Sequence, residues 1–442
     1  MQAMLLSVGA GKGVEYAIAQ TIDQNNPSVI AFIATKQSYP ILDNVIQVLR
    51  DIYNNESAAL ICEKAKEEGL CECISDSDAE DVTMCHQAAL RLIDTLRSRD
   101  VAPKSVTVDF TSGTKPMSAG LVLAAVQAGC KSLSYVGGSH RDEVGRVKRG
   151  AGVVKAVQPT SILLELVRDQ LIKDFNSWQF GACRNNVEWV KSRMDLSLAP
   201  DVEALGTLAD FYEAWDRFDH ARADGLSKQV KEAEKVWHLD TKYNRSVVHR
   251  LAEAKQKPTE ELLRIPKDEQ PSDQDAVLLV ADIYANALRR LQEGRYDDAV
   301  ARLYRVTELV AQIVLLSEFG QFTSCVDKEF LKEHDLLDTY AASTNRKGEI
   351  QLGLYRAYQL LKDLNNEFGG LYLDDAEFQK HIAVRNDSIL AHGFTTVGKE
   401  ACEKLSSDVR ELCCKLVASE KRFNNLLAQC KFPSLSSRTD TT

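Results

Sequence analysis

The strongest constraint on the fold is an alternation of short apolar runs with helical patterns that stops near residue 160. Apolar runs at Met4–Val8, Val29–Ala34 and Ser105–Phe110 are each followed by a stretch with helical periodicity. Strands that are apolar on both faces and alternate with helices are typical of a parallel sheet covered by helices on both sides. From about residue 160 to Ala428 only helical patterns occur. The sequence therefore predicts a mostly parallel α/β part followed by an all-α part.

Weaker patterns complete the predicted sheet. Ala58–Cys62 is predicted as a third strand, Ser132–Val136 as a further strand and Gly152–Val157 as an edge strand. The segment Gly137–Gly150 is rich in glycine and charge, which predicts a hairpin or a mobile loop. Helical periodicity between the strands predicts two long helices, at Asp81–Arg99 and Pro116–Ala128.

Prolines mark the clearest linker in the chain. Lys255–Asp275 contains Pro258, Pro266 and Pro271 among charged residues, and a new helical pattern starts near Ala276. We therefore expect four parts: an α/β domain over 1–158, a helical connector over 159–275, a second helical domain over 276–432 and a disordered polar tail over 433–442.

Composition limits the location and the partners of the chain. It has 442 residues, a formal net charge of −10 and no apolar run long enough to span a membrane, and its start is predicted as a strand, so we expect a cytoplasmic protein. The negative charge argues against coating nucleic acid through the overall field, but it leaves room for a small basic cleft. Eleven cysteines without spaced CxxC units predict free thiols and no metal site.

Two loops follow predicted strands at places where parallel α/β sheets bind ligands, beyond the carboxyl ends of the strands. Gly9–Gly13 brings backbone N–H groups and the start of a helix, and Thr111–Pro116 brings hydroxyls, a glycine and an ammonium group. The predicted residues of a site for a phosphate-bearing ligand are Gly9, Ala10, Gly11, Lys12, Gly13, Thr35, Lys36, Ser112, Gly113, Thr114 and Lys115.

These loops match no complete nucleotide-binding motif. Gly9–Gly13 lacks the spacer and the final GK[ST] of a Walker A motif, and it is not a full GxGxxG. An ordinary strand-to-helix turn is the alternative interpretation. No acid–base pair stands out in this half of the chain, which favours binding over chemistry.

The C-terminal part contains an arginine and a histidine seven residues apart, Arg385 and His392. On a helix that ends at Gly393 both would project from one face, with Asn386 and Ser388 beside them. A solvated arginine and a packed histidine in a helical interaction domain are the structural alternative. The stretch Gly294–Leu309 resembles one helix of a tetratricopeptide repeat, but it has no 34-residue recurrence.

The pair suits RNA cleavage without a metal ion. Histidine moves protons near neutral pH, and arginine binds phosphate oxygens and stabilises the charge of the transition state. The 2′-hydroxyl of RNA would attack the adjacent phosphorus and leave a 2′,3′-cyclic phosphate. One pair supplies one proton carrier, so a composite site on the axis of a homodimer is expected.

These segments resemble known families. Ser7–Gly13 and Asp109–Met117 resemble the CARF domain, the Rossmann-like sensor of CRISPR-associated proteins. Arg385–His392 resembles the R-x4-6-H motif of HEPN ribonucleases, and Gly294–Tyr304 is similar to the helix that precedes this motif in one branch of the family. The order CARF, helical connector, HEPN spans nearly the whole chain.

The resemblance implies an ancillary effector of type III CRISPR immunity. Such proteins are homodimers that bind a cyclic oligoadenylate across the two-fold axis of their CARF domains and then cleave single-stranded RNA with the HEPN pair. Carried over by position, Arg385, Asn386 and His392 are catalytic, and no cofactor is required. The ring size of the activator, the RNA target and degradation of the activator by the CARF domain stay open.

Two other functions compete with this one. The chain would be a non-catalytic nucleotide-sensing regulator if its helical domain only recruits a protein partner. It would be an enzyme of another class if Gly9–Gly13 holds a dinucleotide. Thr35-Lys36-Gln37 stands where such enzymes place an acidic ribose ligand, which counts against the second alternative.

Overall fold

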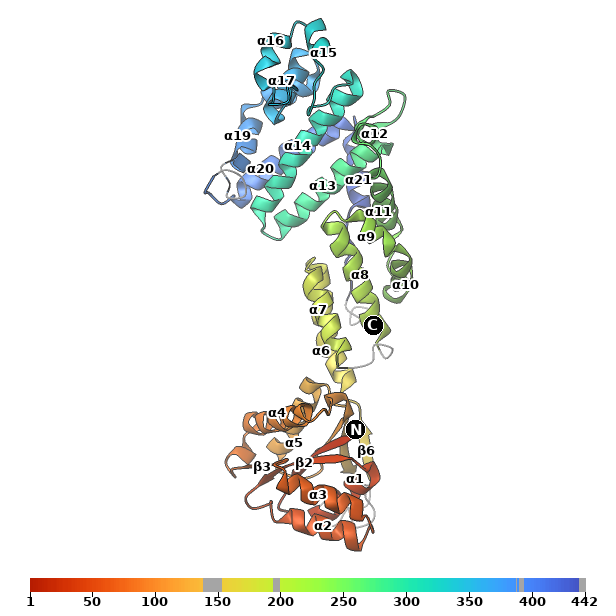
Figure 1. Ribbon diagram of the computed structural model, residues 1–442, viewed down its shortest axis with the longest axis vertical. Helices are drawn as coiled ribbons and strands as arrows, with labels where there is room; N and C mark the ends of the chain where they lie inside the picture. The colour runs from red at the N-terminus through yellow and green to blue at the C-terminus, as the bar shows by residue number, and fades with distance from the viewer. Residues whose placement is uncertain (138–152, 194–198, 387, 389–392, 437–442) are drawn as a thin grey trace. The chain divides into compact units, whose positions relative to one another are not determined.

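The computed structural model describes residues 1–137, 153–193, 199–386, 388 and 393–436. Contacts between Cα atoms divide the chain into two compact units. Unit 1 comprises Met1–Leu171 and Asn185–Glu203, and unit 2 comprises Ile172–Arg184 and Ala204–Thr442. Figure 1 shows that the sheet belongs to unit 1 and that unit 2 is built from helices.

Unit 1 contains a sheet with the strand order β3-β2-β1-β4-β5-β6. The first five strands run parallel, and β6 is antiparallel to β5 at the edge. This confirms the predicted α/β class, including the edge strand. The strands are β1 (Ala3–Val8), β2 (Val29–Thr35), β3 (Cys71–Ile74), β4 (Val106–Asp109), β5 (Ser132–Gly137) and β6 (Val153–Val157).

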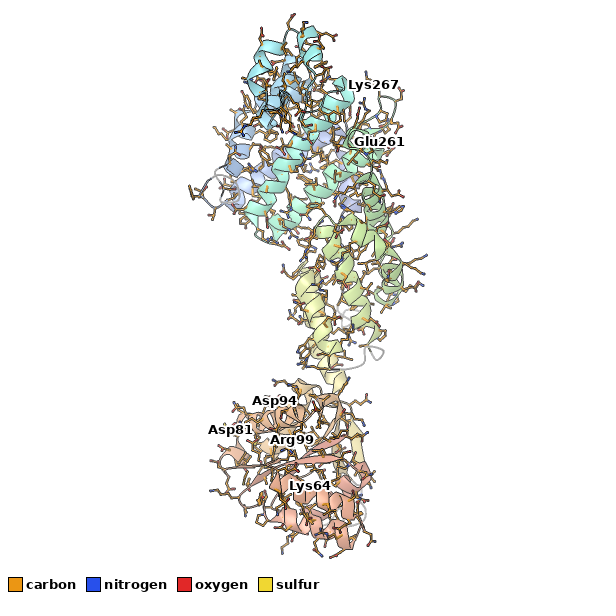
Figure 2. The ribbon with its side chains drawn as sticks, viewed as in Figure 1. Lys64, Asp81, Asp94, Arg99, Glu261 and Lys267 are labelled. Carbon is orange, nitrogen blue, oxygen red and sulfur yellow. The ribbon has the colours of Figure 1, made fainter. Side chains whose placement is uncertain are left out.

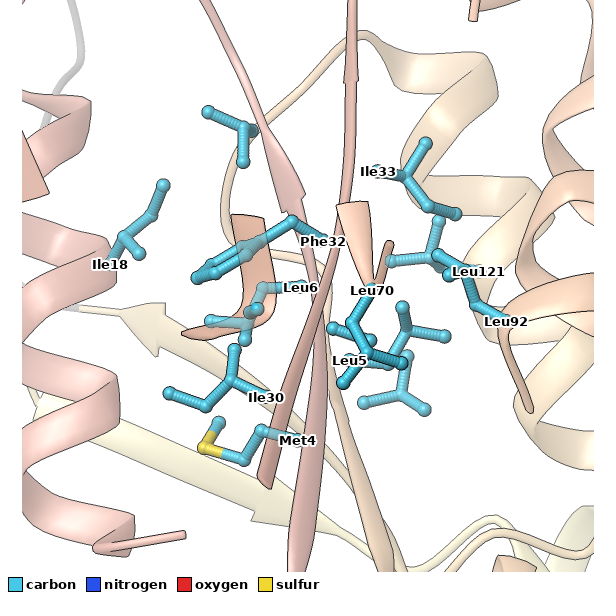
Figure 3. Close-up of a cluster of buried hydrophobic side chains, with 14 of the residues drawn as sticks. Met4, Leu5, Leu6, Ile18, Ile30, Phe32, Ile33, Leu70, Leu92 and Leu121 are labelled. Carbon is cyan, nitrogen blue, oxygen red and sulfur yellow. The ribbon is translucent and has the colours of Figure 1, made fainter. Parts of the chain in front are cut away.

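Both faces of the sheet are covered by helices, as Figure 1 shows. Every residue of β1 is buried, and its side chains alternate between the faces. In Figure 3, Met4 and Leu6 lie on the side of Ile18, whereas Leu5 lies on the side of Leu92 and Leu121. One face carries α1 (Val14–Asn25), α2 (Ile41–Asp51) and α3 (Glu56–Glu67), and the other carries α4 (Val82–Ser98) and α5 (Lys115–Ala128).

The predicted third strand at Ala58–Cys62 is wrong, because this segment lies inside α3. Asn55 caps α3 by accepting a hydrogen bond from the Ala58 N–H, and the buried residues Ala58, Cys62 and Ala65 recur at helical spacing. A short apolar run does not distinguish a strand from a buried helix by itself. The third strand is β3, which follows α3 along the chain. The predicted hairpin or loop at Gly137–Gly150 lies, apart from Gly137, outside the described residues.

Helix α4 begins at a charged cap that can be tested. The carboxylate of Asp81, labelled in Figure 2, accepts hydrogen bonds from the backbone N–H groups of Thr83 (2.7 Å) and Met84 (3.2 Å). We expect Asp81→Ala to lower the free energy of unfolding by about 1 kcal/mol, because two N–H groups lose their acceptor. Asp81→Asn keeps a capping oxygen and should lose less than half of that. Urea unfolding of both variants measures the difference, and equal losses would contradict the role of the cap.

Helices follow the sheet through the rest of the chain, and in unit 2 α13, α14 and α20 pack against one another. This confirms the predicted all-α part. The helices are α6 (Thr160–Asn176), α7 (Phe180–Lys191), α8 (Pro200–Asp216), α9 (His220–Gly225), α10 (Ser227–Trp237), α11 (Lys242–Ala254), α12 (Thr259–Leu263), α13 (Asp275–Gln292), α14 (Tyr296–Phe319), α15 (Lys328–Glu333), α16 (Leu337–Tyr340), α17 (Leu354–Asp363), α18 (Glu367–Leu373), α19 (Ala376–Asn386), α20 (Lys399–Leu416) and α21 (Glu420–Gln429).

The proline-rich segment between α11 and α13 lies within unit 2. Leu263 is buried, and the N–H of Ile265 donates a hydrogen bond to the Ser317 hydroxyl of α14 (2.8 Å). Glu261 and Lys267, labelled in Figure 2, are exposed. The segment therefore packs on α14 through its apolar side, and this packing does not follow from its proline and charge content. The predicted domain boundaries at 158, 275 and 432 stay predictions.

The predicted disordered tail over 433–442 is wrong at its start. Leu435 is buried, and its backbone N–H and C=O are both bonded to the side chain of Asn176 (2.8 and 2.9 Å). Residues 437–442 lie outside the described part. A side-chain amide that satisfies an irregular backbone in this way leaves no sequence pattern near the tail.

The structure also bears on the cysteines and on membrane insertion. All eleven cysteines are free, as predicted, and burial raises the pKa of the Cys62 and Cys130 thiols to about 12. Among the described helices, none combines the length and the apolarity that a membrane crossing requires.

Candidate ligand pocket and candidate nuclease site

The loops after β1 and β4 meet at the carboxyl end of the sheet. The strand order reverses between these two strands, because β2 lies to one side of β1 and β5 lies to the far side of β4. Gly9 and Gly113 approach so closely that a Cβ on Gly9 would lie 2.6 Å from the Gly113 nitrogen. Gly113 has a φ of +96°, which glycine adopts readily. The two predicted loops therefore form one structure.

Serine hydroxyls fasten these loops together. The Ser112 hydroxyl donates to the carbonyl of Ser7 and accepts from the Gly9 N–H (3.3 Å), and the Ser7 hydroxyl donates to the carbonyl of Ser112. Ser112 is thus occupied in holding the loop, so the backbone around it is what the loop presents to a ligand.

Threonines connect the loops to their neighbours. The Thr114 hydroxyl caps α5 by accepting from the Met117 N–H (3.2 Å), and it donates to the carbonyl of Ala79 in the loop between β3 and α4. At the end of β2, the N–H of Thr35 donates to the Ser38 hydroxyl (2.9 Å). The hydrogen bonds thus join the loops after β1, β4 and β3, whereas the loop after β2 is closed on itself.

A cavity of about 440 Å³ lies among these loops. The predicted residues divide into two groups around it. Four are not among its lining residues: Lys12, Gly13, Lys36 and Lys115, each of them exposed. Seven line it: Gly9, Ala10, Gly11, Thr35, Ser112, Gly113 and Thr114.

Sequence reasoning missed the acidic side of the cavity. Asp76 and Glu80, together with Ala79, come from the loop after β3, and Gln37 and Ser38 come from the loop after β2. The loop after β3 was missed because the third strand was placed at the wrong segment. The lining residues include two carboxylates and no lysine or arginine within the described ranges. Carboxylates accept hydrogen bonds from amino and hydroxyl groups, so this side favours the base or sugar of a nucleotide over its phosphate.

In unit 2, Arg385 lies near the end of α19 and is held from two sides. Its guanidinium carbon lies 4.6 Å from the centre of the Tyr304 ring on α14. Its Nη1 donates to the side-chain oxygen of Asn386 (3.3 Å). Burial, followed by the Glu308 carboxylate, raises the pKa of Tyr304, which therefore keeps its proton beside the cation. An aromatic face within about 6 Å stabilises a cation and restricts its orientation.

The predicted continuous helix through His392 to Gly393 is wrong, because α19 ends at Asn386. The Ser388 N–H donates to the carbonyl of Arg385 (3.2 Å), and the Gly393 N–H donates to the carbonyl of Ser388 (3.2 Å). His392 itself lies outside the described residues, so its predicted role stays a prediction. Asn386 and Ser388 are short polar residues of a kind that favours the end of a helix, and Ser388 pairs with Thr395 in an isolated β-bridge.

Helix α14 supports both ends of the loop that follows α19. At the first end its Tyr304 contacts Arg385. At the far end the Val397 N–H donates to the carboxylate of Asp297 (3.4 Å), and Val397 is buried. The loop between these points is therefore attached to one helix at each end.

A second histidine, His381, lies one helical turn before Arg385. Its Nδ1 is 2.6 Å from the Asp408 carboxylate of α20, so the pair ties α19 to α20. Sequence reasoning did not single out His381. In the part of the chain that the structure describes, no three histidine, cysteine, aspartate or glutamate side chains gather as a metal site would require.

The chain thus combines an α/β sheet, with a cavity where its strand order reverses, and a helical part that holds the Arg385 motif. The family model of the Csm6 HEPN domain matches residues 269–416, which include Tyr304, Arg385 and His392. This part of the chain therefore matches the HEPN domain of Csm6, in agreement with the resemblance found in the sequence.

Comparison with solved structures supports the same fold over the whole chain. The chain is similar to Enterococcus italicus Csm6 bound to cyclic hexa-2′-fluoro-hexa-dAMP, with a TM-score of 0.56 and 14% identity. The likeness covers 97% of this chain and 98% of that one. A comparison with curated protein sequences found no match.

Proposed function

We propose that this chain is an endoribonuclease of CRISPR antiviral defence that a cyclic oligoadenylate activates and that cleaves single-stranded RNA in the cytoplasm. The observation that carries the proposal is the oriented guanidinium of Arg385, held by Tyr304 and Asn386 inside the region that the Csm6 HEPN model matches. An arginine fixed in this way is suited to stabilise the charge of a phosphoryl transition state.

The cleavage step needs no metal ion. The 2′-oxygen of the RNA forms a bond to the adjacent phosphorus while the bond from phosphorus to the 5′-oxygen breaks. His392 accepts the proton of the 2′-hydroxyl, and Arg385 stabilises the charge on the phosphate oxygens. A proton passes to the departing 5′-oxygen, and the products are a 2′,3′-cyclic phosphate and a 5′-hydroxyl.

A homodimer supplies the second proton carrier. Two copies of the loop after α19, related by a two-fold axis, would place one His392 as base and the other as acid. The attachment of this loop to α14 at Arg385 and at Val397 supports the idea that a shift of α14 repositions both ends together.

The activator is a cyclic oligoadenylate bound at the cavity of unit 1. Support comes from its place at the carboxyl ends of β1 and β4 and from the similar Enterococcus italicus protein, which is bound to a cyclic hexa-adenylate analogue. Backbone N–H groups of Ala10, Gly11 and Gly113 would receive phosphates, while Asp76 and Glu80 would accept from amino or hydroxyl groups.

The test is a panel of cyclic oligoadenylates, of four and six residues, with a labelled single-stranded RNA. We expect cleavage to rise at least about 10-fold with one ring size and to continue in EDTA, because the reaction uses an imidazole and a guanidinium and no divalent ion. Cleavage that EDTA abolishes and Mg²⁺ restores would contradict metal independence. Tight activator binding without RNA loss would instead favour a non-catalytic regulator.

A further inference from the structure

Three interhelical turns of unit 2 surround a second polar cavity, away from the residues discussed so far. Trp178 comes from the turn between α6 and α7, Phe218 from the turn between α8 and α9, and Arg295 from the turn between α13 and α14. The cavity has a volume of about 530 Å³, in the usual range of small-ligand sites. The turns are distant in sequence, so the cavity is a product of helix packing.

Arginines give this cavity a local positive charge. Arg217, Arg290, Arg295 and Arg302 line it, in a chain whose formal net charge is −10. Glu213, Asp216 and Glu293 also line it and pair with arginines in an ionic network, so the lining side chains carry an excess of one positive charge. The network therefore attracts an anion at a place where the overall field repels it.

Arg290 lines this cavity and has a side-chain donor without a hydrogen-bond partner. Its side chain is only 7% exposed, its Nη2 donates to Asp216 (2.6 Å), and its Nη1 lies 3.2 Å from the Glu293 carboxylate. Its Nε has no hydrogen-bond partner. A buried N–H group without an acceptor is costly, so an acceptor that reached this group would stabilise it. A phosphate oxygen is an acceptor that fits a guanidinium.

Aromatic rings accompany these arginines. Trp178 and Phe218 are half-buried, and their φ angles of +57° and +60° are unusual for bulky residues. Both residues stand just after a helix, where backbone N–H groups bond back to the last turn, so this conformation ends α6 and α8 and turns the two rings out of the helices. Arginines combined with aromatic faces are the standard means of binding single-stranded nucleic acid, whose bases stack while its phosphates are neutralised.

We propose that this cavity binds a phosphate of the single-stranded RNA, with a neighbouring base stacked on Trp178 or Phe218. The cavity would thus be an RNA contact in addition to the Arg385 site. This proposal rests on the proposed function for its choice of RNA. A free mononucleotide has the same chemistry, and the test separates the two.

The test measures RNA binding without cleavage. A fluorescent 2′-O-methyl oligoribonucleotide lacks the attacking hydroxyl, and its Kd is measured by anisotropy at several salt concentrations. We expect Arg217→Gln and Arg295→Gln each to raise Kd about fivefold and to lower the salt slope by about 1. Their side chains are 69% and 53% exposed, so both variants should fold. Arg264→Gln, on an exposed ion pair of unit 2 away from the cavity, is the matched control and should leave Kd unchanged.

Each outcome has a definite meaning. Binding by the native protein that is equal in the cavity variants and the control would overturn the cavity as an RNA site. If adenosine monophosphate displaces the RNA at a concentration similar to that of the oligonucleotide, the ligand of the cavity is a mononucleotide, and the proposal of an RNA strand is overturned. If the cavity variants weaken RNA binding but the native protein cleaves no RNA, the cavity is supported as an RNA site and the proposed nuclease activity is refuted. A native protein that binds no RNA would overturn both.

Discussion

Replacing Arg385 by alanine is expected to lower activator-dependent RNA cleavage by about 10²–10³-fold, the usual loss when one group that stabilises transition-state charge is removed. The guanidinium contacts the Tyr304 ring and bonds to Asn386, so its removal leaves a small space at the end of α19 and little else changes. Affinity for the cyclic oligoadenylate should stay at the native value, because the activator cavity is lined by residues of unit 1.

His392→Ala should cause a loss of about 10²–10⁴-fold, as expected for a group that moves a proton in the transition state. Arg410→Ala is the matched control, since it removes a partly exposed arginine of α20 that pairs with Glu420. Initial rates on a labelled RNA at saturating activator give the comparison. Native activity in the His392→Ala protein would refute the assigned site.

Tyr304 offers a graded version of the same experiment. Tyr304→Phe keeps the aromatic face and should retain most of the activity. Tyr304→Ala removes the face and, at about 0.5–2 kcal/mol for a cation–π contact, should lower the rate between about twofold and 30-fold. A positioning role predicts this order, whereas equal losses in both variants would point to the hydroxyl.

The sheet could be predicted because its strands are buried on both faces. β1 and β2 consist mostly of apolar residues, and all four residues of β4 are buried, so their pattern does not depend on neighbours. β3 has the sequence Cys-Glu-Cys-Ile. Its first two residues are half-buried and the third is exposed, so it gives no such pattern. A helix with small buried residues, α3, supplied a better apolar run and was taken for the strand.

One misplaced strand accounts for much of what sequence reasoning missed at the cavity of unit 1. The loops after β1 and β4 were recognised from glycines and hydroxyls that follow apolar runs. Asp76 and Glu80 follow β3, so they stood in no recognised loop. The lysines were predicted as ligand-binding residues because their loops lie in the right region. Only the packing of the loop decides whether the ammonium group faces the cavity. Lys12 and Lys115 are exposed and do not line it.

The nuclease motif illustrates the limit of helical spacing. A separation of seven residues predicts a common face only while the helix continues, and α19 stops at Asn386. The short polar residues after Arg385 signalled this end in the sequence. The contacts of Arg385 with Tyr304, 81 positions earlier, arise from the packing of α14 against α19 and have no local signal.

Gly9→Ala is expected to weaken activator binding by about 10- to 100-fold, because it disturbs the contact between the two loops that line the cavity of unit 1. The added Cβ would lie 2.6 Å from the Gly113 nitrogen and 3.2 Å from its Cα. Both atoms are backbone, so no side chain can move aside and the two loops must separate. Overpacking of this kind costs about 1–3 kcal/mol, and the loops that move are the ones that line the cavity.

Gly11→Ala tests whether the close approach is the cause. It adds a methyl group to the same loop, but the nearest atom is a side-chain methyl carbon of Val14 at 3.5 Å, an ordinary contact. We expect a loss of activator affinity less than about threefold, because no backbone has to move. Calorimetric titration with the cyclic oligoadenylate measures both variants, and the activator concentration for half-maximal cleavage should shift in parallel. The Gly9→Ala protein could unfold at the same temperature as the native protein and bind the activator as tightly as Gly11→Ala does. That result would show that the cavity does not depend on the contact between the two loops.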